Sequence, residues 1–218
     1  MNKLSIGIVG LPNVGKSTLF KLLTKKEVNI ANYPFCTIDP NIGVVSVPDE
    51  RLEKLAKMSN SEKIIPAVVE FYDIAGLVKG ANKGEGLGNQ FLSHIREVNA
   101  IVEVLRVFKD EDIVHVENSV DPIRDLEIID TELKLKDLES KEKTNLLSNK
   151  PKIYFINGRE EDVTQALKEY IASEGSSYIV ADLKDNPDLS MLAKEAYKIL
   201  NLISFFTTVE KESRAWTI

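Results

Sequence analysis

The sequence contains a single cysteine, Cys36, so a disulfide framework within the chain is excluded. A lone cysteine is typical of a reducing compartment. Long apolar runs are also missing, since no stretch approaches the roughly eighteen residues that a membrane-spanning helix needs. The first ten residues hold one lysine and a short apolar run without a cleavage signal, so they do not resemble a signal peptide. We therefore expect a cytoplasmic protein that does not bind membranes.

Internal repeats, low-complexity tracts and an excess of basic charge are absent as well. The formal net charge is −6, so bulk electrostatics do not predict nucleic-acid binding. What is present is the composition of an ordinary globular domain, 43% hydrophobic and 28% charged, which excludes intrinsic disorder. The length of 218 residues is enough to bury a sizeable core.

Segments with the strand period and the helix period alternate along the chain. Strands are expected at 3–10, 42–47, 66–76, 100–108, 152–157 and 178–181, with a strand-like RAWTI at the end. Helices are expected after residue 16, after Asp49, in 125–147, in 162–173, and from Pro187 to Ile203. This alternation predicts an α/β fold with a mostly parallel sheet and helices on both faces.

Residues 10–18, GLPNVGKST, fit the phosphate-binding pattern GxxxxGK[ST] between the first strand and the first helix. The glycines let backbone amides converge on phosphate oxygens, and the helix N-terminus adds further donors. We expect Lys16 to reach the β- and γ-phosphates and the Ser17 hydroxyl to bind Mg²⁺. The P-loop residues expected to contact the nucleotide are Asn13, Val14, Gly15, Lys16, Ser17 and Thr18.

Two further segments are candidate nucleotide switches. Asp73 and Gly76 belong to DIAG at a strand end, where the carboxylate can hold Mg²⁺ through water and the glycine amide can bind the γ-phosphate. Thr37 lies in the turn-rich NYPFCTIDPN, where a switch loop needs a hydroxyl that joins Mg²⁺ only while a γ-phosphate is present. Mg²⁺ is thus the expected cofactor, held by Ser17, Thr37 and Asp73.

Base selection is expected at the end of the strand KIYFIN, where the chain continues as NGRE. A guanine-specific protein has N-K-x-D there, and its aspartate binds guanine N1–H and the 2-amino group. Here Asn157 is in place, Gly158 replaces the lysine and Glu160 replaces the aspartate, which moves the carboxylate by one methylene. Adenine N6 and N7 can still pair with Asn157, so the residues favour ATP or relaxed selectivity. A GTPase stays open, and a Gly158→Lys, Glu160→Asp double variant is expected to move preference toward GTP.

The segments GLPNVGKST, NYPFCTIDPN, DIAGLVKGANKGEGLGNQFL and RAWTI together resemble the Obg-like ATPase family. The resemblance implies a Ras-like P-loop nucleotide-binding (G) domain of the translation-factor class over residues 1–218. It implies that ATP is preferred over GTP, and that the protein associates with ribosomes and acts in translation or stress control. It also implies that 122–147 form the base of a shortened helical insert and that the family's C-terminal TGS domain is absent. We expect a monomer.

The water that attacks the γ-phosphate needs a group that orients it. Ras-like GTPases have a glutamine after the DxxG glycine, but this sequence has Leu77, which cannot hydrogen-bond to water. From the residues alone, His115 in DEDIVHVEN is a surface histidine more readily than a catalytic one. The resemblance implies that His115 replaces the glutamine and acts together with Lys16 and Gly76. A nucleotide-dependent binding module with incidental turnover is the alternative that Leu77 favours.

Overall fold

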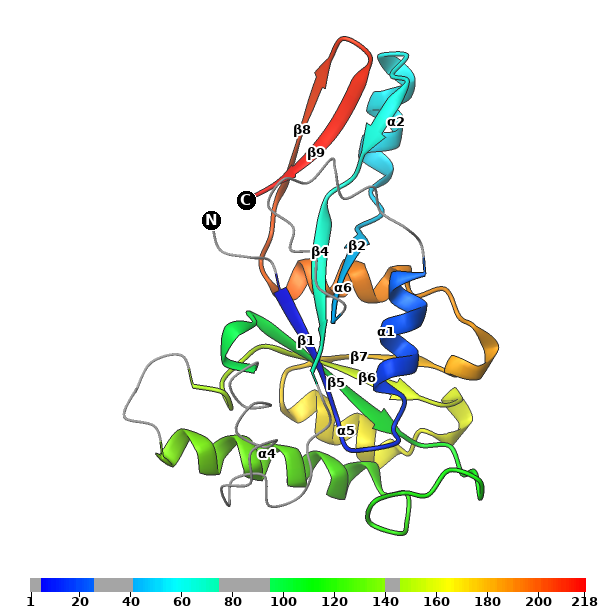
Figure 1. The fold of residues 1–218 in the computed structure, drawn as a ribbon, viewed down its shortest axis with the longest axis vertical. Coiled ribbons are helices and arrows are strands. Elements are labelled where there is room, and N and C mark those ends of the chain that lie inside the picture. Colours follow the sequence, from blue (N-terminus) through cyan, green and yellow to red (C-terminus); the bar gives the residue numbers. More distant parts are fainter. Residues whose placement is uncertain (1–4, 26–40, 75–94, 140–145) are drawn as a thin grey trace.

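The computed structural model describes residues 5–25, 41–74, 95–139 and 146–218. A six-stranded sheet forms its centre, in the order β2-β4-β1-β5-β6-β7 (Figure 1). Its strands are β1 (Ser5–Val9), β2 (Ile42–Ser46), β4 (Val68–Asp73), β5 (Ala100–Arg106), β6 (Lys152–Asn157) and β7 (Ser177–Ala181). β2 runs antiparallel to β4, and the other neighbouring strands are parallel. The predicted mostly parallel sheet is confirmed.

Helices connect these strands, and α2 and α5 begin at residues whose side chains cap them. They are α1 (Lys16–Thr24), α2 (Glu50–Met58), α4 (Pro122–Glu139), α5 (Gln165–Ser173) and α6 (Ser190–Ile199). The Asp49 carboxylate accepts a hydrogen bond from the Arg51 amide at 2.9 Å and caps α2. The Thr164 hydroxyl accepts one from the Leu167 amide at 3.3 Å and caps α5.

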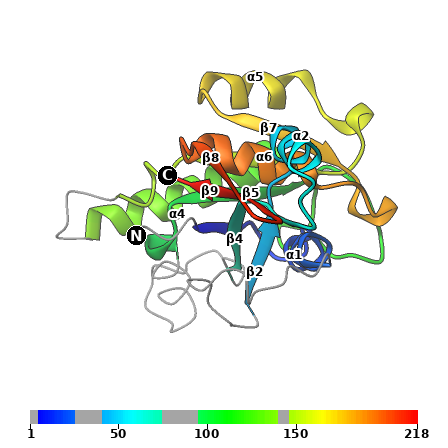
Figure 2. The same ribbon diagram turned by 90° about the horizontal axis from the view of Figure 1, so that it is seen from above.

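The helices cover both faces of the sheet (Figure 2). Along β6, side chains alternate between the faces, so Tyr154 and Ile156 pack in one cluster with residues of α4 and α5. Ile153 and Phe155 belong to the larger cluster that includes residues of α1 and α6. Strands buried on both faces read as continuous apolar runs, which explains why the sequence predicted β1, β5 and β6 well.

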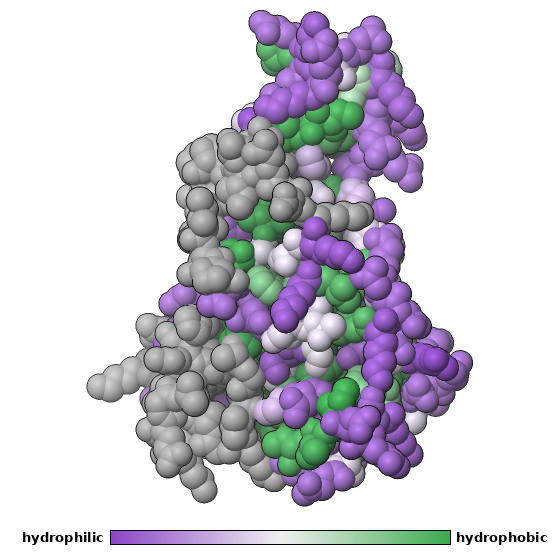
Figure 3. All heavy atoms as spheres, turned by 45° about the vertical axis from the view of Figure 1, so that its right-hand side comes forward, coloured by the Kyte–Doolittle hydropathy of each residue, from purple (hydrophilic) through white to green (hydrophobic). Residues whose placement is uncertain are grey.

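A second sheet of three strands projects from the main body, and the sequence analysis did not predict it (Figure 1). It consists of β3 (Lys63–Ile65), β9 (Glu212–Thr217) and β8 (Ser204–Val209), in the order β3-β9-β8, and α2 packs against it. The segment RAWTI, expected to be strand-like, lies mostly in β9, so that expectation is confirmed. On the face of the molecule in Figure 3, hydrophilic side chains prevail and apolar side chains form separate patches, one of them in this projecting lobe.

The predicted end of the last helix at Ile203 is wrong. α6 ends at Ile199, and Asn201 adopts a left-handed conformation with φ 53°, which is a common way to end a helix. Ile203 is extended and exchanges two backbone hydrogen bonds with Ile218, of 2.9 and 3.0 Å. Its apolar side chain continued the helical stripe in the sequence, but its backbone leads into β8.

The predicted helix at 125–147 is also bounded differently. α4 begins at Pro122 and ends at Glu139. The Asp137 carboxylate accepts hydrogen bonds from the Leu147 amide at 2.8 Å and the Ser148 amide at 2.9 Å, so the chain has turned back beside α4 by residue 147. Across the described ranges, every helix is too short or too polar to cross a bilayer.

Candidate functional site

The P-loop follows β1 and depends on two glycines with positive φ angles. Gly10 has φ 152°, and a Cβ atom there would lie 2.6 Å from the carbonyl oxygen of Val104. Gly15 has φ 111°, and its Cβ would lie 2.5 Å from Asn157 Nδ2. Any other residue at these positions would clash and adopt a strained backbone. Both glycines of the sequence pattern are therefore required by the fold of the loop itself.

The P-loop ends at the N-terminus of α1. Gly15 is the capping residue, and within the described residues no side chain caps the first turn. Ser17 and Thr18 in this turn are exposed, whereas Val14 is buried and anchors the loop. Uncapped amides at a helix N-terminus present partial positive charge to solvent, which is the electrostatic requirement for binding a phosphate.

Lys16 and Asp73 come together beside this turn. The Lys16 ammonium is buried and donates a hydrogen bond to the carbonyl of Leu11 at 2.8 Å. Burial lowers the pKa of Lys16 to about 8, and the nearby Asp73 carboxylate opposes that change. Asp73 is the last residue of β4 and lies in register with Ile8 of β1, directly beside the start of the P-loop.

Two of the three residues predicted to hold Mg²⁺ lie within the described residues. Ser17 offers an exposed hydroxyl in the first turn of α1, and Asp73 offers a half-buried carboxylate at the end of β4. Hydroxyl and carboxylate oxygens are the hard ligands that Mg²⁺ prefers, so both residues fit this ion. Thr37 and Gly76, the other predicted switch residues, lie outside the described residues.

Asn157 clamps two loops together at the end of β6. Its Nδ2 donates a hydrogen bond to the carbonyl of Val14 at 2.9 Å, and its Oδ1 accepts one from the Leu183 amide at 3.2 Å. The side chain is only 4% exposed. Both ends of the amide are thus engaged with the protein, so Asn157 supports the P-loop, and a contact with adenine would require these bonds to open.

Gly158 and Glu160 follow Asn157 in very different environments. Gly158 has φ 147°, and a Cβ atom would lie 2.5 Å from Val107 Cγ2. Glu160 is exposed in a 3-10 turn (Glu160–Asp162), where its Oε1 accepts a hydrogen bond from Lys168 Nζ at 2.5 Å. The Gly158→Lys exchange would therefore strain the backbone before it changed base selection, and Glu160→Asp alone is the cleaner variant.

His115 is buried in the loop between β5 and α4. Its side chain is 2% exposed, and its Nε2 lies 2.9 Å from Asp125 Oδ2 in the first turn of α4. The reading of His115 as a surface residue is therefore wrong. The loop itself contacts the P-loop, because Asn13 Nδ2 donates a hydrogen bond to the carbonyl of Val114 at 3.0 Å. The backbone beside His115 is thus close to the predicted nucleotide site, while its ring is held at α4.

Two residues around this loop were not among the predicted site residues. Asp125 binds the His115 ring, as just described. Arg106, at the end of β5, is 1% exposed, and its guanidinium donates hydrogen bonds to three carbonyls of the loop, those of Phe108, Asp110 and Ile113. The only signal in the sequence was an arginine inside an apolar strand, which indicates a buried cation with a dedicated set of acceptors.

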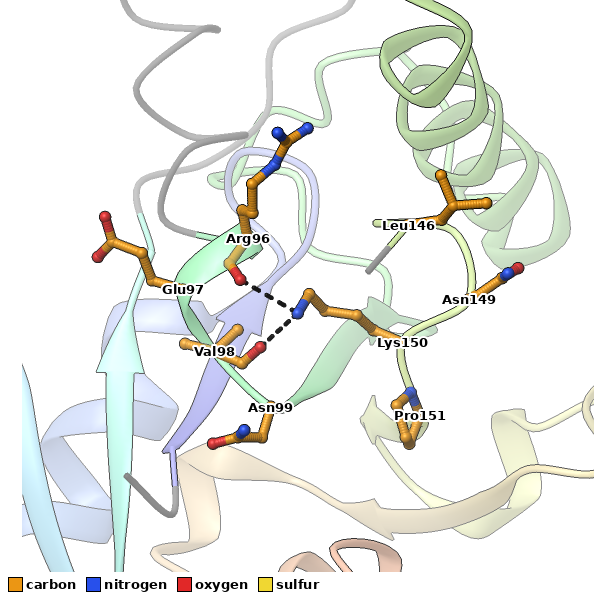
Figure 4. Close-up of a pocket in the computed structure, with 8 residues that line it drawn as sticks. All are labelled: Arg96, Glu97, Val98, Asn99, Leu146, Asn149, Lys150 and Pro151. Atoms are coloured by element: carbon orange, nitrogen blue, oxygen red, sulfur yellow. Dashed lines mark hydrogen bonds between the residues drawn. The ribbon is translucent and has the colours of Figure 1, made fainter. Parts of the chain in front are cut away.

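A separate cavity of about 350 Å³ opens at the amino-terminal ends of the inner strands β5 and β6 (Figure 4). Lys150 reaches across it and donates hydrogen bonds to the carbonyls of Arg96 at 3.2 Å and Val98 at 2.5 Å. The P-loop follows the opposite, carboxyl end of the parallel strand β1. This cavity is therefore not part of the predicted nucleotide site.

Comparison with known proteins identifies the family. Residues 5–158 match the family model described as "50S ribosome-binding GTPase". The chain is 39% identical to the ribosome-binding ATPase YchF of Bacillus subtilis, covering 98% of this chain and 81% of that protein. It is 38% identical to the protein of the same name from Haemophilus influenzae, covering 97% of this chain and 80% of that one.

Solved structures agree with the sequence comparisons. The YchF GTPase of Schizosaccharomyces pombe superimposes with a TM-score of 0.79 at 35% identity, over 100% of this chain and 81% of that one. The FeoB G-domain of Methanococcus jannaschii has a TM-score of 0.57 at 14% identity, over 92% and 99% of the two chains, which shows a shared fold only. Taken with the P-loop geometry, these matches mean that the chain belongs to the YchF group of the Obg-like ATPase family and is a P-loop nucleoside triphosphatase.

Proposed function

We propose that this chain is a Mg²⁺-dependent nucleotide switch that hydrolyses the γ-phosphate of ATP in preference to GTP. The observation that carries the proposal is the P-loop itself. Gly10 and Gly15 have the backbone conformations that an open phosphate-binding loop needs, and Lys16 lies between the loop and Asp73. Catalysis of phosphoryl transfer depends mainly on positioning and on neutralising charge, and these groups supply both.

The phosphates would take the place of the Leu11 carbonyl as the partner of Lys16, and the free amides of the first turn of α1 would bind the remaining oxygens. Ser17 and Asp73 would hold Mg²⁺, joined by Thr37. Bound by these residues, Mg²⁺ would supply positive charge that offsets the charge of the phosphates. Within the P-loop, Asn13, Val14, Gly15 and Thr18 complete the proposed contacts, and the Gly76 amide would meet the γ-phosphate.

The preference for ATP rests on residues 157–160. Reading guanine requires a carboxylate of aspartate length, and Glu160 is longer, exposed and paired with Lys168. The names of the relatives do not decide the matter, since the Bacillus subtilis protein is called an ATPase and the Schizosaccharomyces pombe protein a GTPase. A GTPase of the same fold therefore remains the closest alternative. Asn157 and Gly158 contribute by shaping the loop that would border the base.

We also propose that the protein works on the ribosome, in translation or in the response to stress. Support comes from the relatives, which are named ribosome-binding ATPases. The alignment with the Bacillus subtilis protein extends over 295 positions, more than the 218 residues of this chain, so that relative carries internal residues that this chain lacks. Residues 122–147 are accordingly proposed as the base of a shortened helical insert in a nucleotide-binding domain that spans 1–218.

His115 is proposed to orient the attacking water, the role that Leu77 cannot perform. Its loop contacts the P-loop through Asn13, but its ring binds Asp125, so it must change position before it can act. That arrangement also favours a second candidate function, a nucleotide-dependent binding module whose turnover is incidental.

Phosphate release with ATP and GTP, with and without Mg²⁺, tests the proposal in a series of variants. Lys16→Ala is expected to abolish tight nucleotide binding. His115→Ala is expected to lower kcat for ATP by about 100-fold, the usual contribution of a positioned catalytic group. His94→Ala removes the only other histidine and is the control that keeps turnover. Unchanged turnover in His115→Ala would favour the binding module, and unchanged nucleotide binding in Lys16→Ala would exclude the P-loop as the site.

A further inference from the structure

The ring of His115 uses both of its nitrogens in this structure. Nδ1 accepts a hydrogen bond from the Glu117 amide at 3.2 Å, so the ring proton of the neutral histidine lies on Nε2. Nε2 then donates to Asp125 Oδ2 at 2.9 Å. A histidine that orients water needs a free nitrogen, and His115 has none in this arrangement. The observed conformation of His115 is therefore inactive for orienting water.

Asp125 is itself held by Arg124, so it can keep the histidine in this inactive conformation. Its Oδ1 accepts hydrogen bonds from Arg124 Nη2 at 2.9 Å and Arg124 Nε at 3.3 Å, and the same guanidinium binds the hydroxyl of Ser119 at 2.7 Å. Burial raises the pKa of Asp125, and the hydrogen bonds from Arg124 and His115 oppose that rise. The buried carboxylate thus depends on both partners, which makes the pair with His115 hard to break.

The loop between β5 and α4 also contacts the nucleotide site. On either side of His115, Val114 and Val116 are exposed, whereas His115 is buried. The Val114 carbonyl accepts the hydrogen bond from Asn13 of the P-loop, so a change at Asn13 reaches the residue next to the histidine directly. If the backbone of this loop flipped, the ring of His115 would move to the exposed side that Val114 and Val116 now occupy, next to the P-loop.

We propose that Asp125 is a positioning residue that holds the ring of His115 in an inactive position at the start of α4. Hydrolysis then requires the hydrogen bond between Asp125 and His115 to open. The inference rests on the proposed function, in which His115 orients the attacking water. While the pair is closed, the nucleotide can bind but water is not oriented. Asp125 thereby limits turnover in the absence of a signal that opens the pair, and the Asn13–Val114 contact is the route by which the P-loop reaches it.

The test is the kcat and KM for ATP of the full chain carrying Asp125→Ala, His115→Ala, or both. A hydrogen bond to a charged group is strong enough that its loss raises a minor open population by about tenfold. Asp125→Ala is therefore expected to raise kcat by about that factor and to leave KM nearly unchanged. The double variant is expected to be as slow as His115→Ala, because the gain acts through the histidine.

Two controls keep this test decisive. Asp112→Asn removes the charge of an exposed aspartate in the same loop and is expected to leave kcat unchanged. Asp125→Asn keeps the size of the side chain while removing its charge, so it remains folded if Asp125→Ala does not. It is expected to raise kcat by a smaller factor.

The outcomes separate the two ideas. A kcat at or below the wild-type value in Asp125→Ala contradicts the proposal that Asp125 holds His115 in an inactive position. If Asp125→Ala is unfolded, the same result in Asp125→Asn contradicts it. If His115→Ala keeps wild-type turnover, the proposed role of His115 is wrong, and the inference falls with it. NMR of the ring gives an independent readout, since the Nε2 proton of His115 should exchange slowly with water in the nucleotide-free wild type, where it is bonded to the buried Asp125, and rapidly in Asp125→Ala.

Discussion

Replacing Asn157 with alanine should weaken the binding of ATP and GTP alike. The side chain of Asn157 joins the Val14 carbonyl of the P-loop to the Leu183 amide, and it is 4% exposed. An alanine leaves both of these buried backbone groups without their partners. The P-loop then loses the bond that ties it to the end of β6, before any contact with a base is considered.

The magnitude follows from the two lost hydrogen bonds. Each unpaired buried group costs about 1–3 kcal/mol, so we expect Asn157→Ala to lower the free energy of unfolding by roughly 3 kcal/mol. For a chain of 218 residues this corresponds to a fall in Tm of about 6–12 °C. The same loop would bind the phosphates of either nucleotide. The Kd for ATP and the Kd for GTP should therefore rise by similar factors.

Calorimetry and nucleotide titration measure these two effects in the same samples. Asn149→Ala, which truncates an exposed asparagine, is the matched control and should change neither Tm nor Kd. A variant that loses affinity for ATP but keeps both its Tm and its affinity for GTP would refute the reasoning. Asn157 would then read adenine directly, and the clamp between the two loops would contribute little.

Three further changes test other parts of the structure. Burial raises the pKa of Glu103 to about 8 from its ordinary 4.5, so the folded protein keeps a proton that the unfolded chain releases, and the free energy of unfolding falls as the pH rises between these values. Glu103→Gln should remove this slope in urea denaturation at several pH values; an unchanged slope would contradict the assignment. Gly158→Ala should lower the free energy of unfolding by about 1–3 kcal/mol, because its φ of 147° and the nearby Val107 leave no room for Cβ, and an unchanged denaturation midpoint would argue against that strain. Arg106→Gln should speed hydrogen exchange in the loop 108–115, whose carbonyls the guanidinium binds, and equal exchange would mean that the loop holds itself.

The main sheet could be predicted because its strands carry their own signal. All seven residues of β5 are buried, and the run stays apolar enough to be read as a strand in spite of Glu103 and Arg106. The P-loop could be predicted for a related reason. Its glycines are required by backbone angles and close contacts at their own positions, so the pattern in the sequence is the pattern of the fold.

The projecting lobe could not be predicted in this way. β3 has only three residues, two of them exposed, so it shows neither an apolar run nor an alternation. It is a strand because Lys63–Ile65 pairs with residues 212–214, far along the chain, and such pairing leaves no local pattern. A closer reading of Asn201 would have ended the last helix earlier, since asparagine is common where a helix ends in a left-handed residue.

The environment of His115 was also beyond local patterns. Its burial depends on Asp125, ten residues further on and in the first turn of α4, and on the loop conformation that Arg106 holds. A histidine in a charged loop looks exposed in the sequence, because the residues around it, including Asp110 and Asp112, are polar. Only the fold brings the carboxylate of α4 to the ring.

Paired titrations of fluorescent ATP and GTP analogues, each with and without Mg²⁺, test the central claim most directly. The proposed function predicts Mg²⁺-dependent binding that is clearly tighter for ATP, because Glu160 and Gly158 replace the residues that read guanine. Equal affinity, or tighter binding of GTP, would contradict it and would mean that another segment selects the base and that the protein is a GTPase.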